Sequence, residues 1–425
     1  MFAMIREQFK LTLYRNYLRY KKIIDNIFFV GLVQIFSLIA PLITYPYLVS
    51  VLGMDLYGMV ITAQVMVGYA TLLIDFGSNS VCAKDIAINH NNPYELSKIV
   101  TNVLMTRCIL ALICFLIYLC VILCIETYRS HLLLYLLSYL LIANELLYPQ
   151  FFFQGMENLK VSSILNISIK FIFIGLVFVL VKNHTDYLLV PVLYALGYTI
   201  AGIVALYIMY TKYHIRFVNT KLKNVIYLFK SCFPLLSTDF ICTIKDKWNY
   251  ILIGNYVGMA DVVIYDLGIR ISGLICRPAN VITTVLFPRF ARNRNISKLK
   301  ICMILIFSLS LIMILMTNFF LAEISMFFLN QEIDLLPLRV MSVIPLFLSL
   351  SIFISTDYLI AFAYNKYLLY SIIVTVSAYL SFLIVIWFVG YMNNLWSFIF
   401  LAIISYLTEL IYRLGIFIKK TRGVN

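Results

Sequence analysis

The sequence predicts an all-α integral membrane protein. Of its 425 residues, 63% are hydrophobic and 12% are charged, the mean hydropathy is +0.96, and apolar runs recur from residue 27 to residue 418. Lipid is the solvent that fits so apolar a chain. Because residues 1–26 are polar and basic and the first apolar run is longer than a signal-peptide core, we expect that run to be kept as a spanning helix.

Twelve apolar segments are long enough to cross a membrane. A helix rises about 1.5 Å per residue, so roughly 20 apolar residues span the hydrocarbon core. Pro41 and Pro46 interrupt the first segment, which a membrane helix tolerates where its neighbours satisfy the freed backbone groups. The predicted spans are approximately 27–52, 57–79, 99–124, 132–154, 161–181, 187–211, 231–254, 262–286, 299–321, 335–359, 367–390 and 395–418.

The basic residues predict the orientation of these spans. Lys and Arg gather at both ends of the chain and in the loops that follow even-numbered spans, whereas the opposite loops contain Arg129 and Lys182 as their only basic residues. By the positive-inside rule, both termini are expected in the cytoplasm. The net charge of +14 is then explained by topology and by attraction to anionic lipid headgroups, so nucleic-acid binding need not be invoked.

The chain is predicted to form two six-helix lobes, residues 1–215 and 216–425, joined by a long basic loop after the sixth span. Sliding the second half over the first by about 205 residues aligns Gly53 with Gly258, Met54 with Met259, and Gly68 with Gly273. Because each half has an even number of spans, the halves would be parallel repeats about a pseudo-two-fold axis along the membrane normal. A substrate path between two such lobes is the usual arrangement in transporters.

The eighth span contains charges that lipid cannot face. Asp266, Arg270, Gly273, Arg277 and Asn280 fall within about 80° of one helix face. An ionisable group at the bilayer centre costs at least about 2.5 to 3.5 kcal/mol, so this face is expected to meet a partner or a watery cavity. Either Asp266 neutralises Arg270, four residues away, and leaves Arg277 as the main cation, or both arginines face a ligand.

The seventh span has a similar polar face, with Lys247 beside it and Lys245 pointing elsewhere. Two interpretations remain open. The face is either part of an interhelical salt-bridge ladder, or part of a cationic lumen in which arginines bind phosphate oxygens bidentately. The residues on the face are Asp239, Thr243, Asp246 and Tyr250.

Charged residues also occur in other spans. Glu145 and Lys170 are expected well inside the bilayer, where they can pair across adjacent helices, and Glu409 and Arg413 are expected to form a structural i, i+4 pair. The predicted lumen cations, and so the predicted substrate-binding residues, are Arg270, Arg277, Lys247 and Lys170.

We expect no metal site and no cofactor. Most of the nine cysteines lie in apolar runs without C-x-x-C spacing, which is typical of buried small side chains. The four histidines lie singly in predicted loops.

Three stretches of the first half resemble one transporter family. Residues 49–80 resemble the L-G-x-x-x-Y-G element and D-[FL]-G turn of the Wzx-type lipid-linked oligosaccharide flippases, and residues 83–100 resemble the amphipathic cytoplasmic segment that follows. The most specific stretch, YPQFFFQGMENLK, is similar to the family's F-Q-G-x-E-x-x-K run, here Phe153, Gln154, Gly155, Glu157 and Lys160. The similarity extends over essentially the whole chain, and "GMADVVIYDLGIRISG" resembles the corresponding hairpin of the second half.

This resemblance implies a multi-pass flippase of the bacterial inner membrane, in the multidrug/oligosaccharidyl-lipid/polysaccharide (MOP) superfamily, without enzymatic activity. The implied substrate is an undecaprenyl-diphosphate-linked O-antigen or capsular repeat unit of lipopolysaccharide or polysaccharide biosynthesis. It would pass from the cytoplasmic to the periplasmic leaflet by alternating access through a cationic central cavity. The implied partners are this substrate, membrane lipids, and the polymerase and chain-length regulator of the same pathway. Proton coupling in family members makes Asp266, Asp239 and Glu145 candidate coupling acids, with ion pairing as their alternative role.

Other functions fit the sequence less well. A polysaccharide polymerase or a membrane glycosyltransferase should have long or acidic outer loops, whereas the outer loops here are short and the first has Asp55 alone. A cation-coupled multidrug antiporter of the same superfamily is the nearest alternative, but residues 27–52 lack the carboxylate that such exporters commonly carry in the first span. A purely structural membrane protein is opposed by the resemblance alone.

Overall fold

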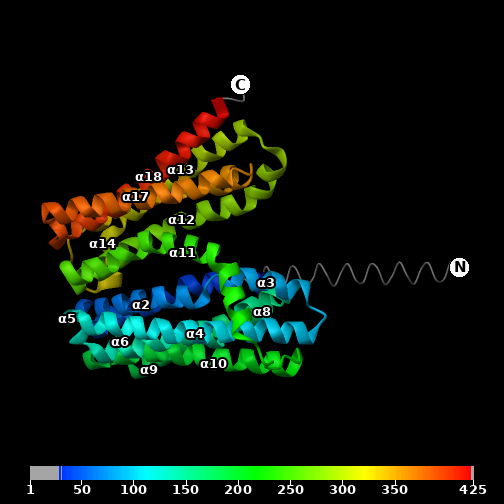
Figure 1. Ribbon diagram of the computed structural model, residues 1–425. Helices are drawn as coiled ribbons and strands as arrows, with labels where there is room; N and C mark the ends of the chain where they lie inside the picture. Colours follow the sequence, from blue (N-terminus) through cyan, green and yellow to red (C-terminus); the bar gives the residue numbers. More distant parts are fainter. Residues whose placement is uncertain (1–27, 30, 423–425) are drawn as a thin grey trace, which may run out of the picture. The chain divides into compact units, whose positions relative to one another are not determined.

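The computed structural model describes residues 28, 29 and 31–422. In this part of the chain every regular element is a helix, and turns and loops join the helices (Figure 1). The predicted all-α membrane fold is thereby confirmed. The basic residues 1–26 lie outside the described residues, and the cytoplasmic location of both termini stays a prediction.

Eleven helices in the described part are long and apolar enough to cross a membrane. The predicted eighth span lies in a further helix of 35 residues, α12 (Met259–Asn293), which is not one of the eleven and contains the aspartate and arginines noted in the sequence. Together they match the expected number of about twelve. The eleven are Gly31–Leu52, Met54–Ile88, Pro93–Cys124, Leu132–Gly155, Leu159–Leu180, His184–Lys212, Leu222–Tyr256, Ile296–Phe319, Leu336–Ile360, Lys366–Val389 and Leu395–Thr421.

Several of these spans are built from more than one helical element. In the first half of the chain the elements are α2 (Met54–Asp75), α3 (Ser78–Ile88), α4 (Pro93–Cys124), α5 (Glu126–Arg129), α6 (Leu132–Ser138), η1 (Tyr139–Ile142), α7 (Ala143–Leu147), α8 (Gln150–Gly155), α9 (Leu159–Leu180), η2 (His184–Leu188) and α10 (Leu189–Lys212). In the second half they are α11 (Leu222–Tyr256), α12, α13 (Ile296–Phe319), α14 (Leu321–Leu329), α15 (Leu336–Met341), α16 (Ile344–Phe353), the π-helix η3 (Ile354–Ile360), α17 (Asn365–Val389), η4 (Tyr391–Asn393) and α18 (Leu395–Arg422).

Two breaks within predicted spans have clear local causes. Between α2 and α3 the backbone takes positive φ angles at Phe76 (41°) and Gly77 (75°), which ends one helix and starts the next. In the fourth span, Tyr148 and Pro149 leave the helical region between α7 and α8, since proline lacks the amide that a helix interior needs. Both breaks bring polar groups to the helix ends.

Contacts between Cα atoms divide the chain into two compact units. Unit 1 contains the described residues up to Tyr47 together with Val67–Ser237, and unit 2 contains Leu48–Met66 together with Thr238–Asn425. The predicted pseudo-symmetric lobes divided after residue 215 stay a prediction.

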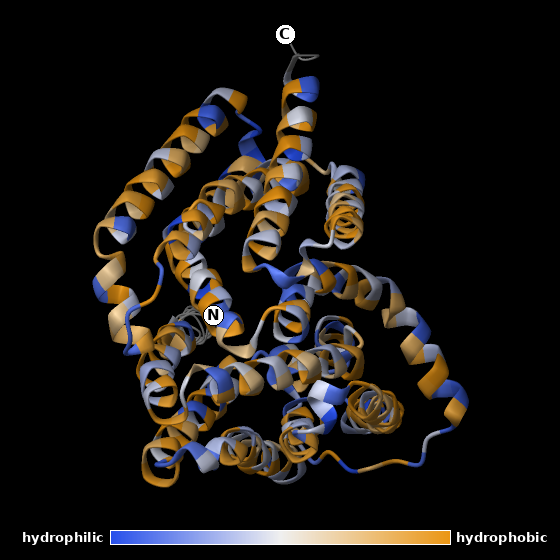
Figure 2. Ribbon diagram, turned by 90° about the vertical axis from the view of Figure 1, so that its left-hand side faces the viewer, coloured by the Kyte–Doolittle hydropathy of each residue, from blue (hydrophilic) through white to orange (hydrophobic). Residues whose placement is uncertain are grey.

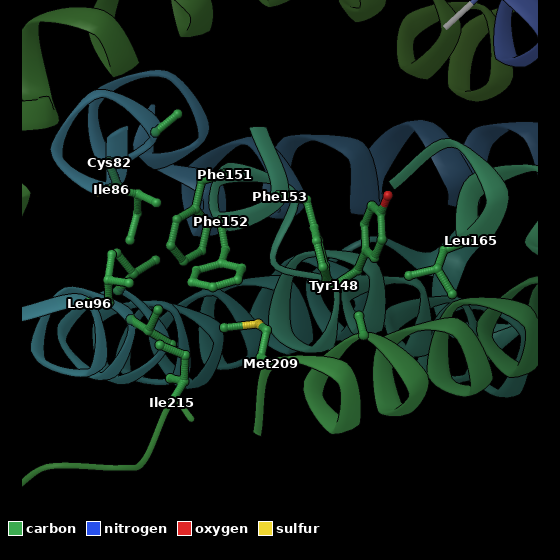
Figure 3. Close-up of a cluster of buried hydrophobic side chains, with 14 of the residues drawn as sticks. Cys82, Ile86, Leu96, Tyr148, Phe151, Phe152, Phe153, Leu165, Met209 and Ile215 are labelled. Carbon is green, nitrogen blue, oxygen red and sulfur yellow. The ribbon is translucent and has the colours of Figure 1, made fainter. Parts of the chain in front are cut away.

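Unit 1 has a core formed by aromatic and aliphatic side chains. α3 packs on α8, and α10 packs along α9 and α7. Phe151, Phe152 and Phe153 of α8 are fully buried, and Figure 3 shows these rings between side chains of the neighbouring helices. Three consecutive phenylalanines can all be buried because α8 is short and has neighbours on several sides. The other labelled members of this cluster are Cys82, Ile86, Leu96, Tyr148, Leu165, Met209 and Ile215.

Unit 2 packs α17 against α18, and α12 and α18 against α16. Its core cluster includes Phe353 and Ile354 at the junction of α16 and η3, with Phe290 of α12 and Phe417 of α18. The segment that runs through α16 and η3 is well enclosed: 61% of its most apolar stretch of 18 residues is buried.

Hydrophobic residues recur along most helices (Figure 2), and many of their large apolar side chains are exposed. On α4, Leu112, Ile113, Leu116 and Ile117 are exposed at the spacing of one helix face. A soluble protein rarely exposes apolar surface on this scale, so these faces fit contact with lipid.

Candidate functional site

Three helices of unit 2 meet at a chain of buried ion pairs. Glu409 of α18 accepts from Lys245 Nζ of α11 at 2.7 Å through Oε2, and from Arg413 Nη1 at 2.7 Å through Oε1. Ser351 of α16 donates to the same Oε1 at 3.2 Å, and its carbonyl and hydroxyl oxygens accept from Arg413 Nη1 at 3.0 and 2.8 Å. The expected pair Glu409–Arg413 thus forms, within a larger network.

This network lines a cavity of about 310 Å³. Asp246 extends the network, because its Oδ1 lies 3.5 Å from Lys245 Nζ and accepts from the Tyr406 hydroxyl at 3.1 Å. Lys245 Nζ also lies 4.6 Å from the centre of the Tyr406 ring. The lining residues are Cys242, Lys245, Asp246, Leu348, Ile352, Ser355, Ile372, Thr375, Val376, Tyr406, Glu409 and Arg413. They include two cations, two anions and several hydroxyl groups among apolar side chains, so the formal charges of the lining cancel.

A second buried carboxylate of unit 2 lies on α12. Asp266 accepts from Arg270 Nε at 2.5 Å and from the Tyr250 hydroxyl at 3.1 Å. Tyr57 is close enough to both charges to interact with them electrostatically. Of the two alternatives left open by the sequence, the structure contains the one in which Asp266 pairs with Arg270.

The other predicted lumen residues of unit 2 are exposed. Arg277 is exposed on α12 and makes no hydrogen bond or ion pair with any described residue. Lys247 is exposed on α11 and is not among the residues that line the cavity, whereas Lys245, which the sequence placed on another face, lines it. Asp239 is also exposed, and its carbonyl oxygen accepts from the Thr243 hydroxyl at 2.8 Å.

Unit 1 contains its own buried cation, Arg107 of α4. Its side chain is fully buried, and it donates from Nη2 to Asp75 Oδ1 at 2.8 Å and from Nη1 to the Glu145 carbonyl oxygen at 2.5 Å. It also donates to the Ser78 hydroxyl at 2.8 Å and to Asn79 Oδ1 at 3.2 Å. The D-F-G turn after α2 therefore supplies acceptors for an arginine three spans into the chain.

Glu145 and Lys170 do not pair with each other. Glu145 Oε2 lies 3.6 Å from Arg107 Nη2, and its Oε1 accepts from the Asn144 side chain at 2.8 Å. Lys170 of α9 instead donates to the hydroxyl of Ser37, in the helix Gly31–Leu52. The expected pair is wrong because Arg107, on another helix, already holds the glutamate.

The F-Q-G-x-E-x-x-K run forms the turn between α8 and α9. A Cβ at Gly155 would lie 2.5 Å from the Ala83 carbonyl oxygen, so glycine is what lets α8 approach α3. Glu157 is exposed and ends the turn with a φ of 53°, and Lys160 is exposed, with Nζ 5.1 Å from the centre of the Phe29 ring. Gln154 is also exposed. Here the motif specifies backbone geometry, and its charged residues lie on the surface.

Sequence reasoning missed the cavity and the arginine network of unit 1, since both join residues far apart in the chain. A usable signal existed: Arg107 and Glu409 lie in apolar runs with no charged residue next to them, and such charges are normally paired across helices. No group of three or more His, Cys, Asp or Glu in the described part is placed to hold a metal ion.

These features define a class of protein. Both units bury paired charged side chains within a multi-spanning helical chain, and unit 2 has a cavity lined in part by charged and hydroxyl groups, as in membrane transporters for polar substrates.

Residues 23–294 match the family described as "Polysaccharide biosynthesis protein", and the chain belongs to that family. This agrees with the resemblance drawn from the sequence motifs. One relative, from Escherichia coli (strain K12), is 23% identical over 275 residues, which is 65% of this chain and just under two thirds (66%) of the relative. Another, from Shigella dysenteriae, is 26% identical over 283 residues, 65% of this chain and 70% of the relative. Both bear the name "Putative O-antigen transporter", which denotes a transporter and not an enzyme.

Solved structures of MATE proteins are also similar. One, in complex with MaD5, has a TM-score of 0.48 at 15% identity and covers 86% of each chain. Another, in the bent conformation, has a TM-score of 0.45 at 15% identity and covers 92% of this chain and 94% of its own.

Proposed function

We propose that this protein is a flippase for a lipid-linked oligosaccharide. Its substrate is an undecaprenyl-diphosphate-linked O-antigen or capsular repeat unit, which it moves from the cytoplasmic to the periplasmic leaflet of a bacterial inner membrane. Membership of the polysaccharide biosynthesis family and the transporter names of the two relatives support this assignment.

The observation that carries the proposal is the cavity of unit 2, which is lined in part by charged and hydroxyl groups. A sugar headgroup crossing hydrocarbon must exchange its hydration for other hydrogen bonds, because each unsatisfied polar group costs several kcal/mol. The cavity offers hydroxyl groups from Ser355, Thr375 and Tyr406 beside charges that are already paired. Its volume of about 310 Å³ is at the small end of ligand pockets, so in this conformation it accommodates part of a headgroup.

The diphosphate requires cations that are not already neutralised. Lys245 and Arg413 share Glu409, and Arg270 is held by Asp266, so these three are poor candidates for a phosphate ligand. Arg277 and Lys247 are exposed, and Arg277 has no ion-pair partner among the described residues. We therefore assign diphosphate binding to Arg277, with Lys247 as a second cation, while sugars occupy the cavity. Contacts dispersed in this way bind the substrate strongly enough to load it and weakly enough to release it.

The test is genetic complementation in the protein's own host. Deletion of the gene should abolish surface polysaccharide and leave lipid-linked repeat units in the cytoplasmic leaflet, and the wild-type gene should restore export. Val376→Trp, which fills the cavity, should fail to restore it.

Val374→Trp is the matched control. It places the same bulk two residues away on α17, at an exposed position that does not line the cavity, and should restore export like the wild type. Protein abundance in the membrane is measured for each variant. If the deletion strain still exports its polysaccharide, the flippase assignment is wrong; if Val376→Trp exports normally, the cavity is not on the substrate path.

A further inference from the structure

One buried carboxyl group plays no part in either network described above. Asp357 lies in η3, is fully buried, and neither of its oxygens has a hydrogen-bond partner. Of the buried charged residues in the described part, the others are Arg107, Asp266, Glu409 and Arg413, and each of these forms an ion pair. Asp357 is therefore the one buried charged residue of the described structure that forms no ion pair.

The surroundings of Asp357 cannot stabilise a negative charge. Its chain neighbours Phe353, Ile354, Tyr358 and Leu359 belong to the buried apolar cluster of unit 2. The helices packed against η3 are α12, α16, α17 and α18. Their charged side chains described in the structure are Asp261, Asp266, Arg270, Arg277, Arg289 and Arg292 of α12, Lys366 of α17, and Glu409, Arg413, Lys419 and Lys420 of α18. None of these side chains forms an ion pair or a hydrogen bond with Asp357. The thiol of Cys302 on α13 is the titratable group that interacts with it electrostatically.

The backbone at this position is also unusual. η3 is a π-helix that continues α16. At its end the spacing of the backbone hydrogen bonds changes: Ala361 N donates to Thr356 O, five residues earlier, at 3.1 Å, and Ala363 N donates to Ile360 O, three residues earlier, at 3.0 Å. Ala363 has a φ of 64°, a conformation that costs a non-glycine residue energy. π-Helical turns are rare and frequently lie at functional sites.

We propose that Asp357 is a proton-binding site. In this conformation the carboxyl group holds a proton, because a bare carboxylate in an apolar, unpartnered position neutralises itself. Losing the proton requires a second conformation in which η3 rearranges and water reaches the carboxylate. Proton release and the movement of the segment through η3 to α17 are thus linked, whatever substrate the protein carries.

The experiment uses the full-length purified protein in detergent and does not depend on transport. A carboxyl group that holds its proton when folded, and loses it to water when unfolded, makes the folded state less stable as the pH rises. Asp357→Asn keeps the shape of the neutral acid without a titrating proton. The thermal midpoint of this variant should therefore rise relative to that of the wild type as the pH is increased. Glu332→Gln, at an exposed acid, is the control whose difference from the wild type should not change with pH.

A chemical probe identifies the site directly. Dicyclohexylcarbodiimide adds to protonated carboxyl groups in apolar surroundings and forms a stable N-acylurea, which peptide mass spectrometry can locate. We expect labelling at Asp357 in preference to the paired Asp266 and Glu409, with a decrease in alkali of up to roughly tenfold per pH unit as the protonated fraction falls. A midpoint difference that is independent of pH, or labelling of Asp357 that persists undiminished in alkali, overturns the proposal. Either result leaves the flippase assignment standing, because that is decided by the complementation experiment.

Discussion

The arginine network of unit 1 and the glutamate network of unit 2 keep charges out of lipid in opposite ways. In unit 1 a single cation, Arg107, is surrounded by acceptors from the α2–α3 turn and from α7. In unit 2 the central residue is an anion, Glu409, which lies between the cations Lys245 and Arg413 and lines a cavity. The first arrangement uses nearly all the donors of one guanidinium group and links the four helices α2, α3, α4 and α7. The second leaves its members beside open space, where an incoming hydroxyl group can take over a contact.

The unit 1 network has a structural role, so removing its central residue, Arg107, should cause the largest loss of stability. Arg107→Met leaves Asp75 and Glu145 without their cation, and breaking a buried ion pair from one side costs on the order of 3–5 kcal/mol. Unfolding of the purified variant in detergent measures this loss. Arg129→Met, at an exposed position of α5, is the control and should stay close to the wild type. An Arg107 variant as stable as that control would contradict the assignment.

Loss of the unit 2 centre should cost less. Glu409→Gln leaves two cations without their shared anion, but Lys245 keeps Asp246 at 3.5 Å and Arg413 keeps its bonds to Ser351. We expect a loss of about 2–4 kcal/mol by the same measurement, because hydrogen bonds to a charged group still offset part of the penalty.

A double-mutant cycle sharpens this comparison. Lys245→Met should destabilise the wild type more than it destabilises the Glu409→Gln variant, since the two residues are in direct contact. Strict additivity of the two changes would mean that the 2.7 Å contact contributes nothing to stability.

A third prediction concerns the packing that supports the unit 1 network. In Gly155→Ala the new methyl group would meet the Ala83 carbonyl oxygen and the Ile86 side chain, so α8 must move away from α3 at a cost of about 1–3 kcal/mol. Gly175→Ala, in α9 of the same unit, meets nothing within 4 Å and should be neutral or slightly stabilising. Equal unfolding midpoints for the two variants would show that the close approach of α8 to α3 is not required.

The sequence predicted those parts of the molecule that depend on local patterns. Apolar length revealed the spans, and the i, i+4 spacing of Asp266 and Arg270 anticipated a pair that the structure contains. The sequence did not predict contacts between residues that are far apart in the chain. Arg107 contacts Asp75 and Glu145 only after three helices have packed, and helical periodicity does not show which helices are neighbours. For the same reason the cavity, built from α11, α16, η3, α17 and α18, was not predicted, and neither was the π-helix around Asp357.

Substitution of Arg277 should change stability least, and it tests whether this charge is functional or structural. Arg277 is exposed and makes no ion pair with a described residue, so Arg277→Ala should change the free energy of unfolding by no more than about 0.5 kcal/mol. In the complementation assay, however, it should lose most of the export activity if the arginine binds the diphosphate. Arg277→Lys keeps the charge but not the bidentate fork and should restore part of that activity. An alanine variant that exports like the wild type would remove Arg277 from the substrate path.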